Sequence, residues 1–286
     1  VKQLCQGKGI VVVEDAAQAM GAKSDEGLIG TAGDIAFFSL GRGKNITSGS
    51  GGIIITKSAA LSALIQAEYS RLPELSGLDV IRNWIEMVAM WCFIHPMLYW
   101  LPAGLPFLGL GETKFYTDFP VFRMDELRAA QLQGWAQRLR EANLQRAACA
   151  HRLIQTLDLP MRDAKTLTRI DGIYLRLPVL MRDRKAKEAI CKLSQESGAG
   201  ISPNYPTTIQ DIPQLSSRIV VRSCPGAQEI VDRLVTLPTH RFVKEGDIRK
   251  LDKLLASTTS NAIPLSQKTR LTDESTSSRP CSIPMK

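Results

Sequence analysis

The feature that most constrains the fold is a loop of glycine and serine residues enclosed by two short apolar runs. The stretch FFSLGRGKNITSGSGG occupies residues 37–52 and contains one lysine, Lys44. Apolar runs over 35–40 and 53–56 flank this loop. Short runs of this composition are typical of buried strands, and glycine permits the unusual dihedrals of a tight loop. The pattern therefore predicts two strands with a constrained loop between them.

A β-branched run comes earlier, at residues 10–13, and ends in Glu14 and Asp15. It indicates a buried parallel strand with polar residues at its carboxyl end. In open α/β sheets this edge is where ligands bind. We therefore expect the first part of the chain, residues 1–118, to be α/β.

The rest of the chain continues the alternation of helices and strands. Residues 122–157 contain no proline and many strong helix formers, which predicts one long helix. Further strands and helices are expected at 173–180, 185–196, 219–222 and 247–255. The predicted units are 1–118 with an apolar insertion near 80–112, a linking helix over 119–157, a small α/β domain over 158–256, and a disordered tail over 257–286, which is rich in Ser, Thr and Pro.

Charge and cysteine content narrow the classes of protein. The net charge of +8 suits anionic partners such as phosphates, nucleic acid or acidic lipid, although a basic solvated surface gives the same value. The arginines of the long helix lack the interleaved aromatic residues that stack on bases, so we expect no nucleic-acid partner. The six cysteines lie far apart, which predicts neither a metal site nor a disulfide framework. A reducing cytoplasm is the simplest compartment.

Four polar residues can meet at the expected sheet edge. Asp15 ends one strand, and Gln18 follows it. Ser39 ends the next strand, and Lys44 lies in the loop. Such residues suit pyridoxal 5'-phosphate, which takes a lysine, an acidic partner for its ring nitrogen and donors for its phosphate. Ordinary strand-end and loop residues would give the same spacing, so spacing alone leaves both interpretations open.

The identities of the residues around these four positions are more specific than their spacing. The stretches VVVEDAAQAMGA, GTAGDIAFFSLGRGKNITSGSGG and FRMDELRAAQLQGWAQRL resemble the DegT/DnrJ/StrS family of sugar aminotransferases. The resemblance continues through YLRLPVLMRDR, NYP and LVTLPTHRFVKEGDIRKL, and leaves out only residues 65–118 and the tail. It implies an α/β fold of the aspartate-aminotransferase type (fold type I). In this chain the large domain would be incomplete and a small C-terminal α/β domain would follow it.

The resemblance also implies a role for each of the four residues. Lys44 matches the lysine that binds the cofactor covalently and later moves protons. Asp15 matches the carboxylate that keeps the ring nitrogen protonated, a role for which we expect it to be buried. Gln18 matches a residue that contacts the cofactor ring, and Ser39 matches a ligand of the phosphate.

By the same resemblance, the full-length protein transfers an amino group to a nucleotide-linked keto sugar in the synthesis of polysaccharide or glycan precursors. Glutamate is the expected amino donor, and a homodimer is the expected assembly. The alternative is a non-catalytic, membrane-associated scaffold that keeps the fold without its chemistry. The complete set of four site residues opposes the scaffold, whereas departures from the family pattern favour it.

The departures concern the cofactor phosphate and the substrate. Ser50 stands where the family usually has Glu, and Val121 stands where it usually has Asn. Asn204 stands where the family has a histidine of the sugar site. Family members also carry a long portion before the first strand predicted here, with a phosphate-binding turn and a ring-stacking residue. We therefore expect residues 1–286 alone not to form a competent enzyme.

Residues 87–111 depart from the family most clearly. They contain no Asp, Glu, Lys or Arg, and their aromatic residues would suit a membrane interface. The length could span a bilayer, but prolines at 96, 102 and 106 interrupt any continuous helix. An insertion packed on the protein or on a dimer partner, and contact with a membrane surface, are both open from the sequence.

Overall fold

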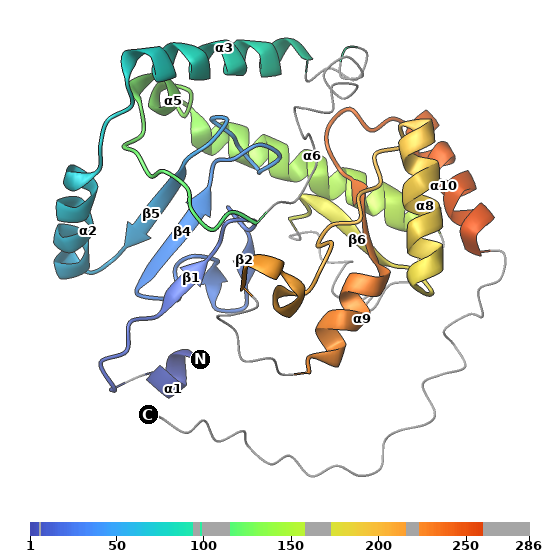
Figure 1. The fold of residues 1–286 in the computed structure, drawn as a ribbon, viewed down its shortest axis with the longest axis horizontal. Coiled ribbons are helices and arrows are strands. Elements are labelled where there is room, and N and C mark those ends of the chain that lie inside the picture. Colours follow the sequence, from blue (N-terminus) through green and yellow to red (C-terminus); the bar gives the residue numbers. More distant parts are fainter. Residues whose placement is uncertain (6, 94–97, 99–114, 158–172, 216–222, 260–286) are drawn as a thin grey trace.

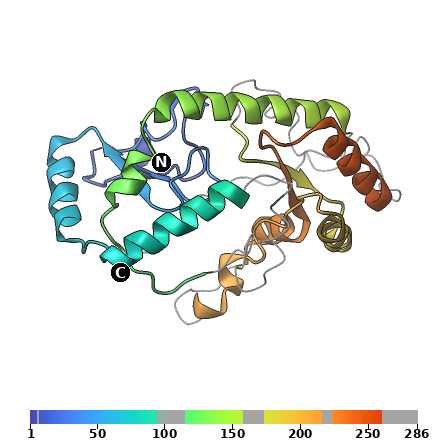
Figure 2. The same cartoon turned by 90° about the horizontal axis from the view of Figure 1, so that it is seen from above.

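A computed structural model describes residues 1–5, 7–93, 98, 115–157, 173–215 and 223–259 of the chain (Figure 1). The described elements form two lobes joined by the long helix α6 (Trp135–Thr156), which runs from the sheet of the first lobe to the helices of the second (Figures 1 and 2). The strand predicted at 219–222, most of the insertion over 87–111 and most of the tail over 257–286 lie outside the described residues.

The first lobe is built on a three-stranded sheet in the order β1-β4-β5. Its strands are β1 (Val13–Asp15), β4 (Ile35–Ser39) and β5 (Gly52–Thr56). β1 and β4 are parallel, and β4 and β5 are antiparallel. Along β4 the side chains of Ala36 and Phe38 enter the core, while Phe37 points to the opposite face. The structure thus confirms the two strands predicted on either side of the glycine-rich loop.

The strand predicted at 10–13 begins later and is not buried on both faces. Val13 is 55% exposed, and Phe37 and Ile54 on the same face are 37% and 57% exposed. The described residues therefore leave this face of the sheet largely uncovered. The prediction of a buried strand was wrong because an apolar run reports composition, whereas burial depends on what packs against it.

Helices α2 (Ala59–Arg71) and α3 (Gly77–Phe93) follow β5, and the short helix α5 (Glu126–Ala130) precedes α6. Ser58 caps α2, since its hydroxyl accepts a hydrogen bond from Leu61 N at 3.3 Å. Asp125 caps α5 in the same way, through Arg128 N at 2.9 Å. The smaller elements of this lobe are α1 (Lys2–Cys5), β2 (Lys23–Ser24) and β3 (Gly27–Leu28).

The single helix predicted over 122–157 is two helices in the structure. α5 ends at Ala130, and α6 begins at Trp135 after a turn in which Gly134 has φ +69°. This left-handed conformation suits glycine and interrupts the helical hydrogen bonds. One glycine is a weak signal within a strongly helical composition, so the sequence pattern did not place the break.

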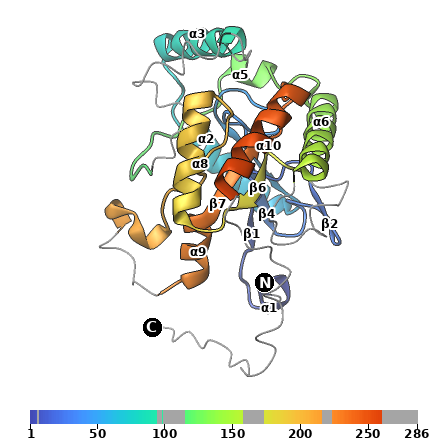
Figure 3. The same ribbon diagram turned by 90° about the vertical axis from the view of Figure 1, so that its right-hand side faces the viewer.

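The second lobe packs helices on the antiparallel pair β6 and β7. Helices α8 and α10 lie side by side over this pair (Figure 3). The core of this lobe includes the fully buried Leu153 of α6, whereas Leu139 of α6 belongs to the core of the first lobe. The helix α6 therefore packs into the cores of both lobes. The bounds are β6 (Arg176–Leu180), α8 (Arg184–Ser197), η2 (Ile209–Asp211), η3 (Pro213–Leu215), α9 (Pro225–Arg233), β7 (Leu234–Pro238) and α10 (Glu245–Thr259).

Candidate functional site

The sheet of the first lobe brings three of the four predicted residues to one edge. Because β1 and β4 are parallel, Asp15 and Ser39 end their strands on the same side. β5 is antiparallel and begins on that side, since Gly52 pairs with Ser39. The loop between β4 and β5, residues 40–51, is therefore at the same edge and carries Lys44; we call it the lysine loop.

Hydrogen bonds within the lysine loop hold its shape. Leu40 O accepts from Ser48 N at 3.1 Å, and Leu40 N donates to Gly51 O at 2.9 Å. The Leu40 side chain is fully buried. Gly51 has φ +99°, and a Cβ there would lie 2.7 Å from Met124 Cε. The backbone conformation therefore requires glycine at this position, whereas the flexible Met124 side chain could move away from a Cβ.

Lys44 is half-buried, and its backbone amide donates to Gly41 O at 3.3 Å. Desolvation lowers the pKa of the Lys44 ammonium group below its ordinary value, while the charge of Asp15 opposes this shift. A lowered pKa leaves more of the neutral, nucleophilic amine near neutral pH. The structure thus brings Lys44 and Asp15 close enough to interact electrostatically.

Asp15 lies at the strand end where it was predicted, but its side chain is exposed rather than buried. Its Oδ1 accepts a hydrogen bond from Ala17 N at 3.0 Å. The exposed face of the sheet, with Val13 and Phe37, extends to this residue. The position of Asp15 at the end of the strand could be predicted, because an apolar run that ends in a carboxylate is a local pattern. Its exposure could not be predicted, because burial depends on which distant residues pack on the sheet.

Ser39 ends β4, and its hydroxyl oxygen accepts a hydrogen bond from Gly41 N at 3.2 Å. A serine hydroxyl in this state still has its own proton to donate, for example to a phosphate oxygen. A Cβ at Gly41 would lie 3.3 Å from Ser39 Oγ, so glycine keeps the space beside the hydroxyl open. The donor set of amine, carboxylate, hydroxyl and glycine backbone fits pyridoxal 5'-phosphate.

Gln18 connects this edge to the second lobe. Its Nε2 donates a hydrogen bond to the Tyr205 hydroxyl at 3.3 Å. Tyr205 has φ +60° and is the only non-glycine residue with positive φ in the described part of the chain. Sequence reasoning noted Tyr205 within a family motif but did not bring it to the site, because no local pattern relates residues so far apart.

Asn143 of α6 is a second residue that the sequence did not predict at the site, and it holds the lysine loop through Asn45. Asn45 is buried, and its Nδ2 donates to Asn143 Oδ1 of α6 at 2.7 Å. Asn143 Nδ2 in turn donates to Met20 O at 3.1 Å. The residue after Lys44 is thereby fixed to α6 and to the segment that follows β1. An asparagine within a helix carries no sequence signal for such a contact.

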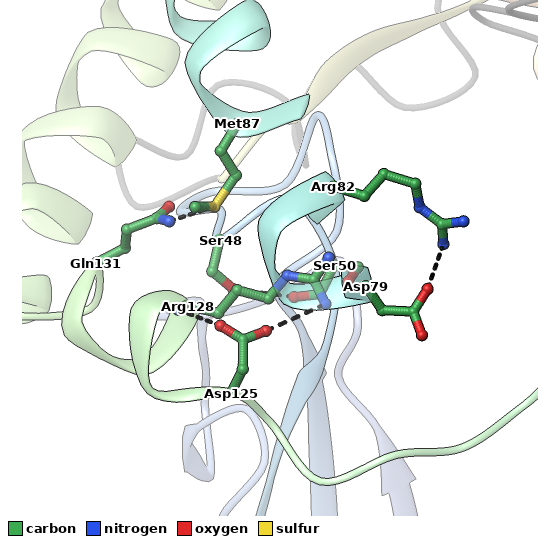
Figure 4. Close-up of polar contacts among 8 residues, drawn as sticks. All are labelled: Ser48, Ser50, Asp79, Arg82, Met87, Asp125, Arg128 and Gln131. Atoms are coloured by element: carbon green, nitrogen blue, oxygen red, sulfur yellow. Dashed lines mark hydrogen bonds and ion pairs between the residues drawn. The ribbon is translucent and has the colours of Figure 1, made fainter. Parts of the chain in front are cut away.

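Helices α3 and α5 pack beside the lysine loop. Met87 of α3 contacts Gln131, and Asp125 pairs with Arg128 at 3.6 Å (Figure 4). Asp125 Oδ2 and Arg128 Nε are buried without a hydrogen-bond partner among the described residues. Asp125 also caps α5. We therefore infer that this ion pair stabilises α5, which packs beside the lysine loop, and has no direct part in catalysis. Ser50, which departs from the family pattern, accepts at its carbonyl a hydrogen bond from Ser48 Oγ at 2.9 Å (Figure 4).

The other departure from the family pattern in this region is Val121, which is exposed. Arg123, two residues later, pairs with Glu74 at 2.9 Å and donates from Nε to Leu72 O at 3.1 Å. Arg123 is thus bound within the chain, to the segment between α2 and α3.

A cavity of about 620 Å³ lies elsewhere, in the second lobe between α8 and α9. Arg184 and Arg233 line it and form ion pairs with Glu188 and Glu229. The cavity contains none of the four predicted residues. We place the site at the lysine loop because that edge holds a partly desolvated amine next to a carboxylate.

The chain is similar to several known proteins. The DegT/DnrJ/EryC1/StrS aminotransferase family matches residues 1–85 and 109–255. The chain is 38% identical over 89 residues to GDP-perosamine synthase of Vibrio cholerae, which is 31% of this chain and 23% of that protein.

Two solved structures share the fold. DesI, determined in the presence of its TDP-sugar product, has a TM-score of 0.64 at 20% identity, over 91% of this chain and 58% of that one. A putative sugar aminotransferase from Streptococcus pneumoniae in its PMP form has a TM-score of 0.61 at 14% identity, over 89% of this chain and 60% of that one. The chain therefore spans less than two thirds of the length of these proteins.

Proposed function

The chain belongs to the DegT/DnrJ/EryC1/StrS aminotransferase family, and on this premise we propose that the whole protein is a pyridoxal 5'-phosphate-dependent aminotransferase that acts on a nucleotide-linked keto sugar. We propose glutamate as its amino donor. The α/β architecture is that of fold type I sugar aminotransferases. The observation that carries the proposal is the partly desolvated Lys44 beside Asp15 at the strand edge.

Each site residue has a chemical task in this proposal. When bound, pyridoxal 5'-phosphate supplies an electron sink for the carbon that gains or loses the amino group. Lys44 would hold the cofactor and take up or release the proton at that carbon, a task that a neutral amine can perform. Asp15 would keep a proton on the ring nitrogen. Ser39 would donate to the phosphate, and Gln18 would contact the ring.

The substrate class rests on the relatives. One is named for the synthesis of GDP-perosamine, and another was determined with a TDP-sugar product. Both names support a nucleotide-linked sugar, and hence a role in supplying precursors of polysaccharides or other glycans. The net charge of +8 suits the diphosphate of such a substrate. A homodimer is part of the same proposal.

Assays of the full-length protein with glutamate and a panel of nucleotide-linked keto sugars test the activity. Lys44→Ala is expected to abolish amino transfer. Lys57→Ala is the matched control, because Lys57 Nζ bonds Thr31 O at 3.1 Å on another loop. Borohydride reduction of the loaded protein should leave a pyridoxyl group on the peptide that contains Lys44. Labelling of a different lysine, with Lys44 unmodified, contradicts the assignment.

The second candidate is a non-catalytic, membrane-associated scaffold with the same fold. The exposure of Asp15 and the residues Ser50 and Val121 favour it, whereas the interaction of Lys44 with Asp15 opposes it. An absorption spectrum of the full-length protein after mixing with pyridoxal 5'-phosphate and gel filtration separates the two. The aminotransferase keeps a protein-bound chromophore that Lys44→Ala loses, and the scaffold keeps none.

A further inference from the structure

The lysine loop carries a second basic residue, Arg42, two positions before Lys44. These two are the only basic residues of the loop. Lys44 N donates to Gly41 O at 3.3 Å, and Gly43 has φ +77°. The hydrogen bond closes a tight turn with Arg42 and Gly43 as its central residues, and glycine suits the positive φ of the second of them. The shape of the loop thus holds the backbone of Arg42 at the candidate site.

The same turn keeps Arg42 close to Ser39, the residue proposed to donate to the cofactor phosphate. Three residues of fully extended chain span at most about 10–11 Å. The chain between the two is bent rather than extended, since Gly41 N donates to Ser39 Oγ at 3.2 Å. A Cβ at Gly43 would meet no atom within 4 Å, so the space beside the turn is open. A group that Ser39 binds therefore lies near the Arg42 side chain.

The Arg42 guanidinium has one exposed partner. Its Nη2 donates to Glu86 Oε2 of α3 at 3.2 Å, and the two side chains are 51% and 48% exposed. An ion pair at this exposure contributes little to stability, because water screens both charges. Nε and Nη1 of Arg42 have no hydrogen-bond partner among the described residues. The guanidinium can therefore exchange Glu86 for a stronger acceptor with little loss of stability.

The charges of the candidate site leave Arg42 as the cation for a phosphate. A phosphate monoester carries about −1.5 to −2 charges near neutral pH. In the proposed function Lys44 holds the cofactor and Asp15 serves its ring nitrogen, while Ser39 offers only a neutral hydroxyl. Arg42 is the remaining cation of the lysine loop. A guanidinium is well suited to a phosphate, because it can donate two parallel hydrogen bonds to it.

We propose that Arg42, together with Ser39, binds the phosphate group of pyridoxal 5'-phosphate, and that Glu86 competes with this phosphate for the guanidinium. The inference rests on the proposed function, since it requires that cofactor at the lysine loop. The diphosphate of a nucleotide-linked substrate has the same chemistry. The cofactor is favoured because the Ser39 hydroxyl, the phosphate donor of this sheet edge, lies three residues before Arg42.

Binding measurements on the full-length protein, freed of cofactor, test this role without reference to activity. Absorption titrations with pyridoxal 5'-phosphate and with pyridoxal, which lacks the phosphate, give two dissociation constants. Arg42→Gln should weaken binding of pyridoxal 5'-phosphate by about tenfold, the effect of losing a hydrogen bond to a charged group. Binding of pyridoxal should stay unchanged. Glu86→Gln should strengthen binding of pyridoxal 5'-phosphate by about two- to fivefold, because it removes an exposed ion pair that competes with the phosphate.

The ion pair of Arg152 and Glu245 in the second lobe is the matched control. Arg152 Nη1 and Glu245 Oε1 lie 3.1 Å apart, and the side chains are 47% and 63% exposed. This pair resembles that of Arg42 and Glu86 in length and exposure but does not belong to the lysine loop. Arg152→Gln and Glu245→Gln should therefore leave both dissociation constants unchanged.

An Arg42→Gln protein that binds pyridoxal 5'-phosphate as tightly as the wild type overturns the proposal. Equal losses of affinity for pyridoxal 5'-phosphate and pyridoxal overturn it as well, because they indicate a general change of the loop. Weaker binding of GDP with unchanged binding of pyridoxal 5'-phosphate assigns Arg42 to the diphosphate of a substrate instead. A wild-type protein that binds neither pyridoxal nor its phosphate contradicts the proposed function and this inference together, so the two failures are distinguishable.

Discussion

The Tyr205 hydroxyl accepts a hydrogen bond at 3.3 Å from the side-chain amide of Gln18, although 187 positions separate the two residues. Gln18 follows the strand that ends at Asp15, whereas Tyr205 belongs to the second lobe. Tyr205 also has φ +60°, a conformation that costs about 1–3 kcal/mol in a residue with a Cβ atom. Such strain is concentrated at functional sites, and here it directs a side chain of one lobe to the candidate site of the other.

Tyr205→Phe is expected to lower kcat/KM by about two- to tenfold, because it removes the hydrogen bond to Gln18. One such hydrogen bond contributes about 0.5–1.5 kcal/mol. The free energy of unfolding should change little, since the side chain is exposed. Steady-state kinetics of the full-length protein, together with urea unfolding, check both expectations. Tyr69→Phe on the surface of α2 is the control. Kinetics identical to those of the wild type show that the contact has no part in the site.

Lys44 is expected to react with acetic anhydride at lower pH in the folded, cofactor-free protein than in the same protein unfolded in urea. Desolvation holds the pKa of Lys44 below its ordinary value, with Asp15 opposing the shift. Asp15→Asn removes the opposing charge, so the midpoint of the Lys44 labelling profile should move to still lower pH. Mass spectrometry of peptides labelled across a pH series gives both midpoints. A Lys44 midpoint that is the same in the folded and in the unfolded protein contradicts the shift.

Local patterns were sufficient to predict the lysine loop and its flanking strands. Apolar runs, glycines and strand-end polar residues are all properties of neighbouring positions, and they placed Asp15, Ser39 and Lys44 at one edge. The family resemblance added the roles of these residues, which the geometry alone does not assign.

Packing could not be predicted from the same patterns. Asp15 is exposed because the described residues leave its face of the sheet largely uncovered. No residue near Asp15 in the sequence specifies what packs on that face. The break before α6 depends on the left-handed conformation of one residue, Gly134. Asn143 and Tyr205 lie far along the chain from the residues that they contact, so neither contact follows from a local pattern. Asn143 reaches Asn45 through the packing of α6 on the first lobe, and Tyr205 reaches Gln18 from the second lobe.

Asn143→Ala is expected to lower the free energy of unfolding by about 1–3 kcal/mol, because it leaves the buried amide of Asn45 without its partner. Retention of pyridoxal 5'-phosphate should fall as well, since the lysine loop loses its tie to α6. Asn45→Ala combined with Asn143→Ala should cost less than the sum of the single changes. Urea unfolding of the wild type, the two single variants and the double variant measures these free energies. Gln137→Ala on the exposed side of α6 is the control. Additive costs contradict a coupled pair.

Glu14 supplies a pH-dependent contribution to the stability of the site. Its side chain accepts hydrogen bonds from Gly30 N at 2.9 Å and from Gly33 N. Burial raises the pKa of Glu14, but the hydrogen bonds from Gly33 and Gly30 outweigh this effect and hold the pKa below its ordinary value of 4.5. The folded protein therefore binds this proton less readily than the unfolded chain. The stabilisation is fully present above the ordinary pKa and is lost as the pH falls through the folded value.

Glu14→Gln keeps the size of the side chain but removes its charge, so the two glycine amides lose a carboxylate acceptor. At neutral pH we expect the free energy of unfolding to fall by about 1.5–3 kcal/mol, the range for hydrogen bonds to a charged group. The difference from the wild type should shrink as the pH is lowered, because the wild-type carboxylate becomes protonated there. Urea unfolding from neutral to acid pH measures this convergence. Glu26→Gln, at an exposed position of the β2–β3 turn, should run parallel to the wild type, and a Glu14→Gln curve that also stays parallel contradicts the role assigned to Glu14.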